Sequence, residues 1–317
     1  MSRNEDRMSG EKLVTAPHPA PAIMMMKPEM NYINPTEFIK LPSEGKYYPS
    51  GHPLSGSNSI EVRFMTAKEE DILSSRALLK KGIALERLLE NVIVDKSINP
   101  QTMFVGDRSA VLVAARITGY GNDYDVNVVC PSCMEKTKYT FDLARCVDLV
   151  SNEKEEDSEK EKIKTTEENP FGDDLLQKSK ILRKSQSPEI SENGIFVVHL
   201  PRANVDVTCR LLTGKDEKLM AERIEMRKKA KLPEAASTDQ MRLFITAIGN
   251  DTSAKTVNGF IDTMAASDAR YLREVYADTV PSVNFEQIFT CSECSESIIM
   301  EVPLTAELFW FRRKIYK

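Results

Sequence analysis

The sequence predicts a mostly helical α+β fold made of two duplicated modules, each running from strands through helices to a hairpin that carries a Cys-x-x-Cys pair. The two pairs are Cys130 with Cys133 and Cys291 with Cys294. An aspartate, Asp107 or Asp268, precedes the first cysteine of each pair by 23 residues. Between aspartate and cysteine, each copy shows apolar residues at helical spacing and then an alternating strand. This shared order predicts that the second half repeats the first.

A further repeated pattern lies upstream of the aspartates. Residues 63–70 read RFMTAKEE and residues 210–217 read RLLTGKDE. In each copy a threonine stands three positions before an acidic residue, Thr66 before Glu69 and Thr213 before Asp216, which is typical of a capped helix start. The second copy has 14 more residues than the first between this threonine and its aspartate, which indicates an insertion among its helices.

The elements of the first copy follow from hydrophobic periodicity and from residues that start and stop helices. We expect a strand at 60–65, a helix from Thr66 that Gly82 terminates, and a second helix at 83–94. A third helix is expected to begin at Asp107 or Ser109 and to end at 119–121. Strands at 124–129 and 138–143 then flank the first cysteine pair.

The second copy has the same kinds of element. Alternating residues at 196–200 and 205–211 predict a hairpin. Helices are expected at 214–231, 238–248, 255–265 and 267–279, and strands at 285–289 and 297–302 around the second cysteine pair. The aligned copies also share a leucine ten positions after the second cysteine, Leu143 and Leu304.

Composition divides the chain into four parts. Residues 1–34 are polar, proline-dotted and rich in methionine, which predicts a disordered tail. The first module spans 35–146, and 147–194 form an acidic linker, because 151–170 hold eight acidic and four basic residues and little to bury. The second module spans 195–317. It ends in the aromatic and basic stretch 304–316, whose Phe309, Trp310 and Phe311 suit either a protein interface or the core beside the second hairpin.

The cysteine pairs indicate one shared metal site. Zinc prefers four soft ligands at tetrahedral corners, and one Cys-x-x-Cys turn supplies two of them, so two turns complete a structural Zn²⁺ site of the zinc-ribbon kind. The predicted ligands are Cys130, Cys133, Cys291 and Cys294. Redox-active dithiols and ordinary free thiols remain as alternatives. Cys146 and Cys209 have no nearby cysteine partner and are expected to be buried as small hydrophobic residues.

Composition and motifs argue against several function classes. The net charge of −5 disfavours a surface built to coat nucleic acid, and the basic runs 227–231 and 312–314 suit helix C-termini. No apolar run is long enough to span a membrane and no secretory signal is found, so we expect a cytoplasmic protein. The three histidines are His18 in the tail, His52 in a turn and His199 in a strand. With no phosphate-binding loop either, we predict no catalytic residues and no enzymatic activity.

The first module resembles a known family in several motifs. They are Leu41-Pro-Ser-Glu-Gly45, Met65 to Leu73 (MTAKEEDIL), Gly106-Asp107, Arg116-Ile-Thr-Gly-Tyr-Gly121 and Cys130-Pro-Ser-Cys133. Their order is similar to that of the baseplate hub assembly proteins of T-even-type contractile-tailed bacteriophages. The resemblance implies a non-enzymatic late phage protein that binds other baseplate and hub proteins in the host cytoplasm. It leaves open whether the protein stays in the finished virion.

The function predicted from the sequence is binding and assembly, with helical faces that dock hub subunits and a zinc site that fixes the pose of the two modules. Two alternatives from other classes stay open. A nucleic-acid-binding zinc-ribbon protein, for example a transcriptional one, would bind DNA with an affinity that falls steeply with salt. A thiol oxidoreductase would turn over a disulfide substrate through its cysteine pairs.

Overall fold

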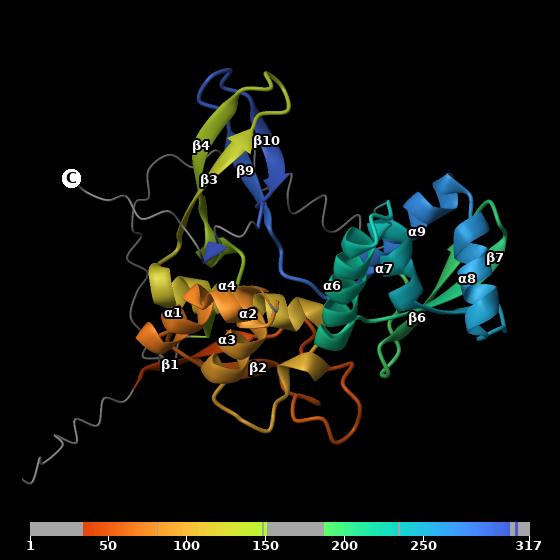
Figure 1. The fold of residues 1–317 in the computed structure, drawn as a ribbon, viewed down its shortest axis with the longest axis horizontal. Helices are drawn as coiled ribbons and strands as arrows, with labels where there is room; N and C mark the ends of the chain where they lie inside the picture. The colour runs from red at the N-terminus through yellow and green to blue at the C-terminus, as the bar shows by residue number, and fades with distance from the viewer. Residues whose placement is uncertain are drawn as a thin grey trace, which may run out of the picture. The chain divides into compact units, whose positions relative to one another are not determined.

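The computed structural model describes residues 34–80, 82–147, 149–150, 187–233, 235–304 and 308–309 of the 317-residue chain (Figure 1). These residues belong to a unit that begins at Asn34. The expected N-terminal tail up to residue 33, most of the acidic linker and the basic C-terminal residues lie outside the described part of the chain.

Three short strands form the sheet of the first half. β1 (Thr36–Lys40) pairs antiparallel with β2 (Ser59–Arg63). β5 (Leu149–Val150) pairs with the other edge of β1, which gives the strand order β2-β1-β5. β5 lies within the segment expected to be an acidic linker. Two residues near the start of that segment are therefore paired with the sheet of the first half.

The helices of the first half begin largely where the sequence predicts. They are α1 (Ala67–Ser74), α2 (Arg76–Lys80), α3 (Ala84–Val92) and α4 (Val105–Tyr120), with a 3-10 turn, η1 (Pro100–Thr102), before α4. The capping box at Thr66 is confirmed. The prediction of one helix up to Gly82 is wrong, because Ser75 ends α1 with an extended ψ of 106°. Serine favours helix ends, and Leu79 beyond it is exposed, so burial does not hold the two segments as one helix.

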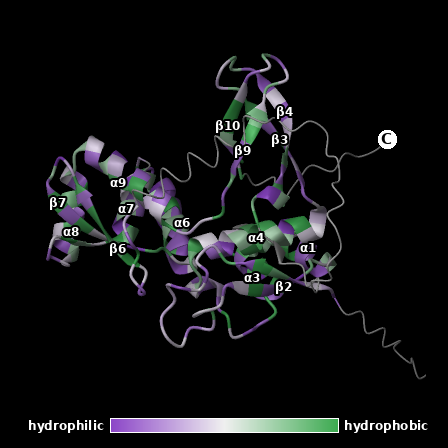
Figure 2. Cartoon of the chain, turned by 180° about the vertical axis from the view of Figure 1, so that it is seen from behind, coloured by the Kyte–Doolittle hydropathy of each residue, from purple (hydrophilic) through white to green (hydrophobic). Residues whose placement is uncertain are grey.

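α4 begins earlier than predicted. Its first residue is Val105, so Asp107 is the third residue of the helix and does not start it. The carboxylate of Asp107 instead accepts hydrogen bonds from a distant loop, a contact that sequence reasoning did not see. The predicted end is confirmed: Gly121 follows the helix with a φ of 84°, a left-handed conformation that favours glycine. Much of α4 is buried, and Figure 2 shows it largely in the hydrophobic colour.

The second half has its own antiparallel sheet, in the order β6-β7-β8. β6 (Ile195–Leu200) and β7 (Val205–Arg210) form the predicted hairpin, and β8 (Ile245–Ile248) pairs with β7. The helices are α6 (Gly214–Lys229), α7 (Ala236–Phe244), α8 (Ala254–Thr263) and α9 (Ala266–Thr279). The expected helix 238–248 is wrong in its last four residues, which form β8. Their alternation buries Ile245 and Ala247 beside β7, and this strand pairing outweighs the helical spacing.

Two further hairpins carry the cysteine pairs. β3 (Asp123–Val129) pairs with β4 (Lys136–Asp142), and β9 (Glu286–Thr290) pairs with β10 (Ser297–Glu301). A 3-10 turn, η2 (Leu143–Arg145), follows β4. The two hairpins lie side by side in both views, although they are far apart in the sequence (Figures 1 and 2).

The buried apolar residues form two clusters. The first joins the strands and helices of the first half to both cysteine hairpins, because it includes Phe289, Val302 and Phe309. The second contains buried residues of the second half alone, with Phe196, Phe244 and Tyr276 among them. Phe309 therefore fills the core, whereas Trp310 and Phe311 lie outside the described residues. None of the described helices is long and apolar enough to cross a membrane.

Candidate metal centre

Both cysteine pairs lie in turns with the same backbone geometry. The turns span residues 130–135 and 291–296 between paired strands. The N–H of the first cysteine donates to the carbonyl five residues later, over 2.9 Å at Cys130 and 3.0 Å at Cys291. The residue after the second cysteine, Met134 or Ser295, has a left-handed φ of 62° or 58°. A turn of this kind directs both sulfurs of its pair to one point.

The four sulfurs of the two pairs lie together at the ends of the hairpins. The Sγ atoms of Cys130 and Cys294 are 3.7 Å apart, and those of Cys133 and Cys291 are 3.8 Å apart. All four lie within 4.8 Å of one another. A tetrahedral Zn²⁺ with bonds of about 2.3 Å separates its sulfur ligands by about 3.8 Å. The donor set and its spacing therefore fit a tetrahedral metal ion.

The electrostatics of the cluster favour a cation. Backbone N–H groups, first that of Cys133, lower the pKa of the Cys130 thiol to about 7. The N–H of Glu135 acts in the same direction on Cys133, but burial and the neighbouring sulfurs outweigh it and raise the pKa of that thiol to about 12. One thiolate is thus stabilised, while a second beside it meets like charge. A divalent cation among the sulfurs would relieve this repulsion and allow all four to ionise.

The hairpins also contact each other below the cysteines. The Tyr139 hydroxyl donates to the carbonyl of Ile288 at 2.9 Å, and its ring packs edge-on against Phe289. The side-chain amide of Gln287 donates to the carbonyl of Asp142 at 2.7 Å and accepts from the N–H of the same residue at 3.3 Å. Because Gln287 is buried, these bonds are shielded from water. The sulfur cluster thus closes an interface that runs along both hairpins.

The two remaining cysteines lie outside the cluster. Cys146 and Cys209 are both buried, which confirms their prediction as small core residues. The sulfur of Cys146 accepts a hydrogen bond from Gln287 at 3.3 Å and so contributes to the hairpin interface. Burial raises the pKa of both thiols, that of Cys209 to about 12, so both are held as neutral thiols at neutral pH.

The two aspartates that precede the cysteine pairs occupy matching positions. Asp107 is the third residue of α4 and Asp268 is the third residue of α9, and both are buried. Asp107 accepts hydrogen bonds from Ser43, through its N–H at 3.0 Å and its hydroxyl at 2.6 Å, and from the Tyr48 hydroxyl at 2.7 Å. Asp268 accepts from the N–H of Arg202 at 3.2 Å. Each aspartate ties the helix before a cysteine hairpin to a loop after the first strand of its half.

Sequence reasoning found the aspartates but missed what they bind. Their partners follow a Leu-Pro dipeptide at the end of β1 and of β6: Ser43 comes after Leu41-Pro42, and Arg202 comes after Leu200-Pro201. In both halves the N–H of the residue after proline donates to the aspartate. The repeated Leu-Pro was the signal that could have predicted this contact.

The capping motif has the same contacts in both halves. Arg63 donates twice to the Glu69 carboxylate, at 2.6 and 3.2 Å, and Arg210 donates twice to Asp216, at 2.6 and 3.0 Å. Burial alone would raise the pKa of both carboxyls, but the bonds from arginine and threonine lower it below its ordinary value. The repeated arginine is therefore a partner of the helix cap.

The starts of α4 and α6 meet through backbone bonds. The N–H of Val105 donates to the carbonyl of Leu212, and the N–H of Gly214 donates to that of Met103, each at 3.0 Å. Gly106 lies against another part of the second half, because a Cβ atom added there would come within 2.0 Å of the Pro281 carbonyl oxygen. The Gly106-Asp107 motif thus joins the two halves and also holds the first-half loop.

A buried arginine reinforces this junction. Arg108 on α4 donates to Glu217 of α6 at 2.9 Å, to Glu86 at 3.2 Å and to the carbonyl of Pro100 at 2.6 Å. The pKa of Glu217 is raised above its ordinary value, because the effect of burial outweighs the opposite effect of the adjacent Arg108. Separating the halves would break the ion pair between Arg108 and Glu217 and leave the buried guanidinium with its first-half partners alone, so this contact opposes separation.

The described histidines have ordinary structural contacts. His52 stacks on Tyr48, accepts a hydrogen bond from the N–H of Leu54, and has its other ring nitrogen 2.9 Å from the Thr102 hydroxyl. His199 is exposed and lies 2.7 Å from Asp206 on the neighbouring strand. Packing and cross-strand pairing account for these two residues, while His18 lies outside the described residues.

The fold and the cluster define a class of protein: a mixed α/β protein with small antiparallel sheets, in which four close cysteines from two hairpins could hold a metal ion. A comparison with protein families is more specific. The model of the T4 bacteriophage base plate protein family matches residues 34–195, about half of the chain. The chain therefore belongs to this family, and it is a structural protein of a phage baseplate at the virion tail. No curated protein and no solved structure matches it significantly.

Proposed function

We propose that the protein is a non-enzymatic subunit of the baseplate hub, which docks other hub proteins while one structural Zn²⁺ clamps its two halves. The observation that carries the clamp is the spacing of the four sulfurs, 3.7 and 3.8 Å between residues that are more than 150 positions apart in the sequence. The hub assignment rests on the family motifs, which meet in the fold: Ser43 of the Leu-Pro-Ser-Glu-Gly motif bonds to Asp107 of the Gly-Asp motif.

The proposed role of zinc is structural. Four thiolates fill a tetrahedral coordination sphere and leave no open position for a substrate. Zinc binding is worth about 10–16 kcal/mol in small peptides, which is comparable to the stability of a whole domain. Such an ion would hold the second hairpin on the first-half core, where Phe289 and Val302 are buried. Docking partners would then meet a scaffold of defined geometry.

We further propose that the two halves arose by duplication, with modules at 35–146 and 195–317 joined by the acidic segment 147–194. The support is the repeated set of contacts: a capping box with a bidentate arginine, an aspartate at the third helical position, and a cysteine turn of the same backbone. Each contact joins matching positions in the two halves. Two short motifs that were similar only by chance would not be expected to share their hydrogen-bond partners too.

The decisive experiment for the metal is zinc quantification on the full-length protein. We expect about one zinc per chain in the wild type and almost none in Cys133→Ser. Cys146→Ser serves as the matched control, because its sulfur lies outside the cluster, and it should retain the metal. Wild-type protein purified without zinc or any other bound divalent metal would contradict the clamp.

The hub role requires a separate experiment. Chemical cross-linking and mass spectrometry on assembled baseplates should give cross-links from this protein to hub proteins at the centre of the baseplate. Cross-links confined to peripheral baseplate proteins would contradict the hub assignment. Steeply salt-dependent DNA binding by the purified protein would favour the nucleic-acid alternative, and turnover of a disulfide substrate would favour an oxidoreductase.

A further inference from the structure

A cleft in the second half lies apart from the cysteine cluster and has no role in the function proposed above. It has a volume of about 580 Å³ and is lined by residues of α6, α7, β8 and the start of α8. Arginine side chains enter it from two helices, Arg223 from α6 and Arg242 from α7. Thr246, Thr252 and Asn258 add uncharged polar groups to its wall. Its size is within the range of sites that bind small molecules or peptide side chains.

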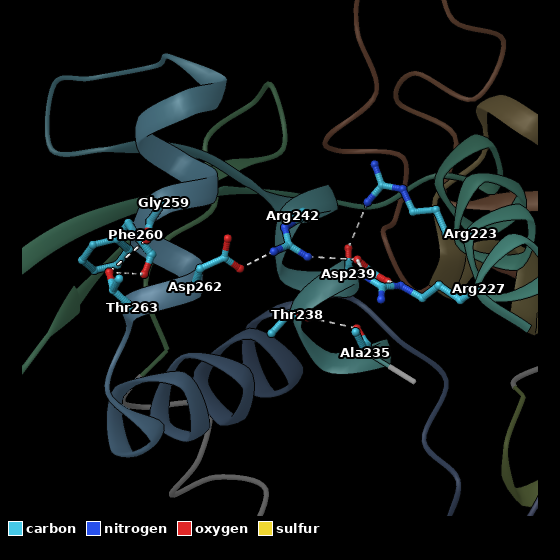
Figure 3. A network of polar contacts seen from close by, with 10 residues as sticks. All are labelled: Arg223, Arg227, Ala235, Thr238, Asp239, Arg242, Gly259, Phe260, Asp262 and Thr263. Atoms are coloured by element: carbon cyan, nitrogen blue, oxygen red, sulfur yellow. Dashed lines mark hydrogen bonds and ion pairs between the residues drawn. The ribbon is translucent and has the colours of Figure 1, made fainter. Parts of the chain in front are cut away.

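A buried aspartate positions the arginines of this cleft. Asp239 is 5% exposed, and Figure 3 shows three guanidinium groups directed toward it. Its carboxylate accepts from Arg227 at 2.8 Å and from Arg242 at 3.0 Å. Arg242 also pairs with Asp262 of α8. These ion pairs fix the position of Arg242 before any ligand arrives, and such preorganisation reduces the entropy lost on binding.

Of the three arginines, Arg223 makes the weakest contact with Asp239. Its guanidinium makes a long hydrogen bond to the network, 3.5 Å from Nη1 to the backbone carbonyl of Asp239. A guanidinium has five N–H donors in a planar fork that matches a carboxylate, so Arg223 keeps donor capacity toward the cleft. Together, three arginines face two aspartates here, which gives the site a net positive charge of one unit.

We infer that this cleft binds an acidic peptide segment of a partner baseplate protein, with a carboxylate of that segment held by Arg223 and Arg242. The inference rests on the proposed docking role and names the chemistry of one partner. The charge of the cleft is complementary to a carboxylate, and its apolar residues Ile245 and Val257 suit the aliphatic part of a glutamate side chain.

A peptide fits the cleft better than a nucleic acid. Single-stranded nucleic acids are held by aromatic stacking and by a groove of many basic residues. The described residues that line this cleft include no aromatic side chain on which a base could stack. A net charge of one unit is matched by a single carboxylate.

The test uses the full-length protein and a fluorescein-labelled hexaglutamate peptide, with binding followed by fluorescence anisotropy at low salt. We expect saturable binding by the wild type and a loss of affinity of about tenfold or more in Arg223→Gln, because a charge-assisted hydrogen bond is removed. Asn258→Asp, which adds a negative charge to the wall without disturbing the arginines, should weaken binding as well. Arg270→Gln is the matched control: it removes the same charge from a surface ion pair with Glu274 on α9, and its affinity should not change.

Several outcomes would overturn the inference. These are no saturable binding by wild-type protein, an equal loss in Arg270→Gln, or an Arg223-dependent affinity for a single-stranded DNA oligonucleotide that exceeds the affinity for hexaglutamate. Zinc content and hub cross-links do not depend on Arg223. If those fail while peptide binding holds, the proposed function is wrong and the cleft assignment stands.

Discussion

The two halves of the molecule share their local contacts but differ in where their hairpins and outer strands pack. In the first half, β5 pairs with the edge of β1 that lies opposite β2. The chain after α3 meets β2 through a single β-bridge, between Ile93 and Val62. In the second half, β8 follows α7 and forms a full pairing with β7. Both cysteine hairpins join the core of the first half, so the second core, as far as the described residues go, is built around β6 to β8 without a cysteine hairpin.

This difference separates two kinds of interaction. Capping boxes, cysteine turns and the aspartate contacts recur in both halves because each depends on a few residues with matching positions. The sheet edges and the hairpin docking differ because they depend on which surfaces are available in the whole fold. If the halves are duplicates, sequence change has altered the packing of their strands and hairpins more than these matched hydrogen bonds.

The largest expected effect comes from removing the metal, because the second cysteine hairpin, β9 and β10, would no longer be held on the core of the first half. Cys133→Ser, or wild-type protein treated with a chelator, should lose about 5 kcal/mol or more of stability. Hydrogen exchange should accelerate in residues 123–142 and 286–301, while β6 to β8 stay protected, because their core lies in the second half. Equal acceleration in β6 to β8 would contradict a clamp that acts on the hairpins.

The next effect tests the contact between the halves at Gly106. Gly106→Ala should destabilise the protein by about 3 kcal/mol, because its Cβ would lie 2.0 Å from the Pro281 carbonyl oxygen and force backbone to move. Gly259→Ala in α8 is the matched control. Apart from its chain neighbours and the backbone of its own helix, no atom lies within 4 Å of its added Cβ, so it should stabilise the protein by about 0.5–1 kcal/mol. Urea unfolding measures both, and equal effects would argue against the close approach.

A smaller loss of stability is expected when either of the two buried aspartates is replaced. Asp107→Asn should cost about 2–3 kcal/mol, because it replaces a carboxylate that accepts from the hydroxyls of Ser43 and Tyr48 as well as from a backbone N–H. Asp268→Asn should cost about 1–2 kcal/mol, because Asp268 accepts from the N–H groups of Arg202 and Ala203. Chemical unfolding of the two variants in parallel gives the comparison, and a larger loss at Asp268 would reverse it.

The smallest effect concerns the capping motif and its pH dependence. The pKa values of Glu69 and Asp216 are lowered in the fold, so their stabilising contribution is present above the unfolded-state pKa near 4 and is lost as the pH falls through the folded value. At pH 7, Glu69→Gln and Asp216→Asn should each cost about 1 kcal/mol, since their arginine partners are partly exposed. The difference from wild type should shrink toward pH 3. A stability difference that persists at pH 3 would show that the cost of these substitutions comes from the shape of the side chain and not from its charge.

Local features of this fold could be predicted from residue patterns because their partners are near in sequence. Thr66 with Glu69, the β6–β7 hairpin and the six-residue cysteine turns are each set by hydrogen bonds over a few positions. The meeting of two distant cysteine pairs was also predictable, because a tetrahedral zinc site needs four ligands and each turn holds two. That the four sulfurs hold zinc stays a prediction.

By itself, the sequence determined the helix caps, the hairpins and the supply of soft ligands, since these depend on short-range geometry. The tertiary structure alone decided that Ile245–Ile248 forms a strand, that α4 begins at Val105, and that Asp107 binds Ser43 and Tyr48. Each of these outcomes depends on a partner more than 35 residues away. Periodicity cannot identify such a partner, because burial and hydrogen bonding there become favourable only after the chain has brought the two surfaces together.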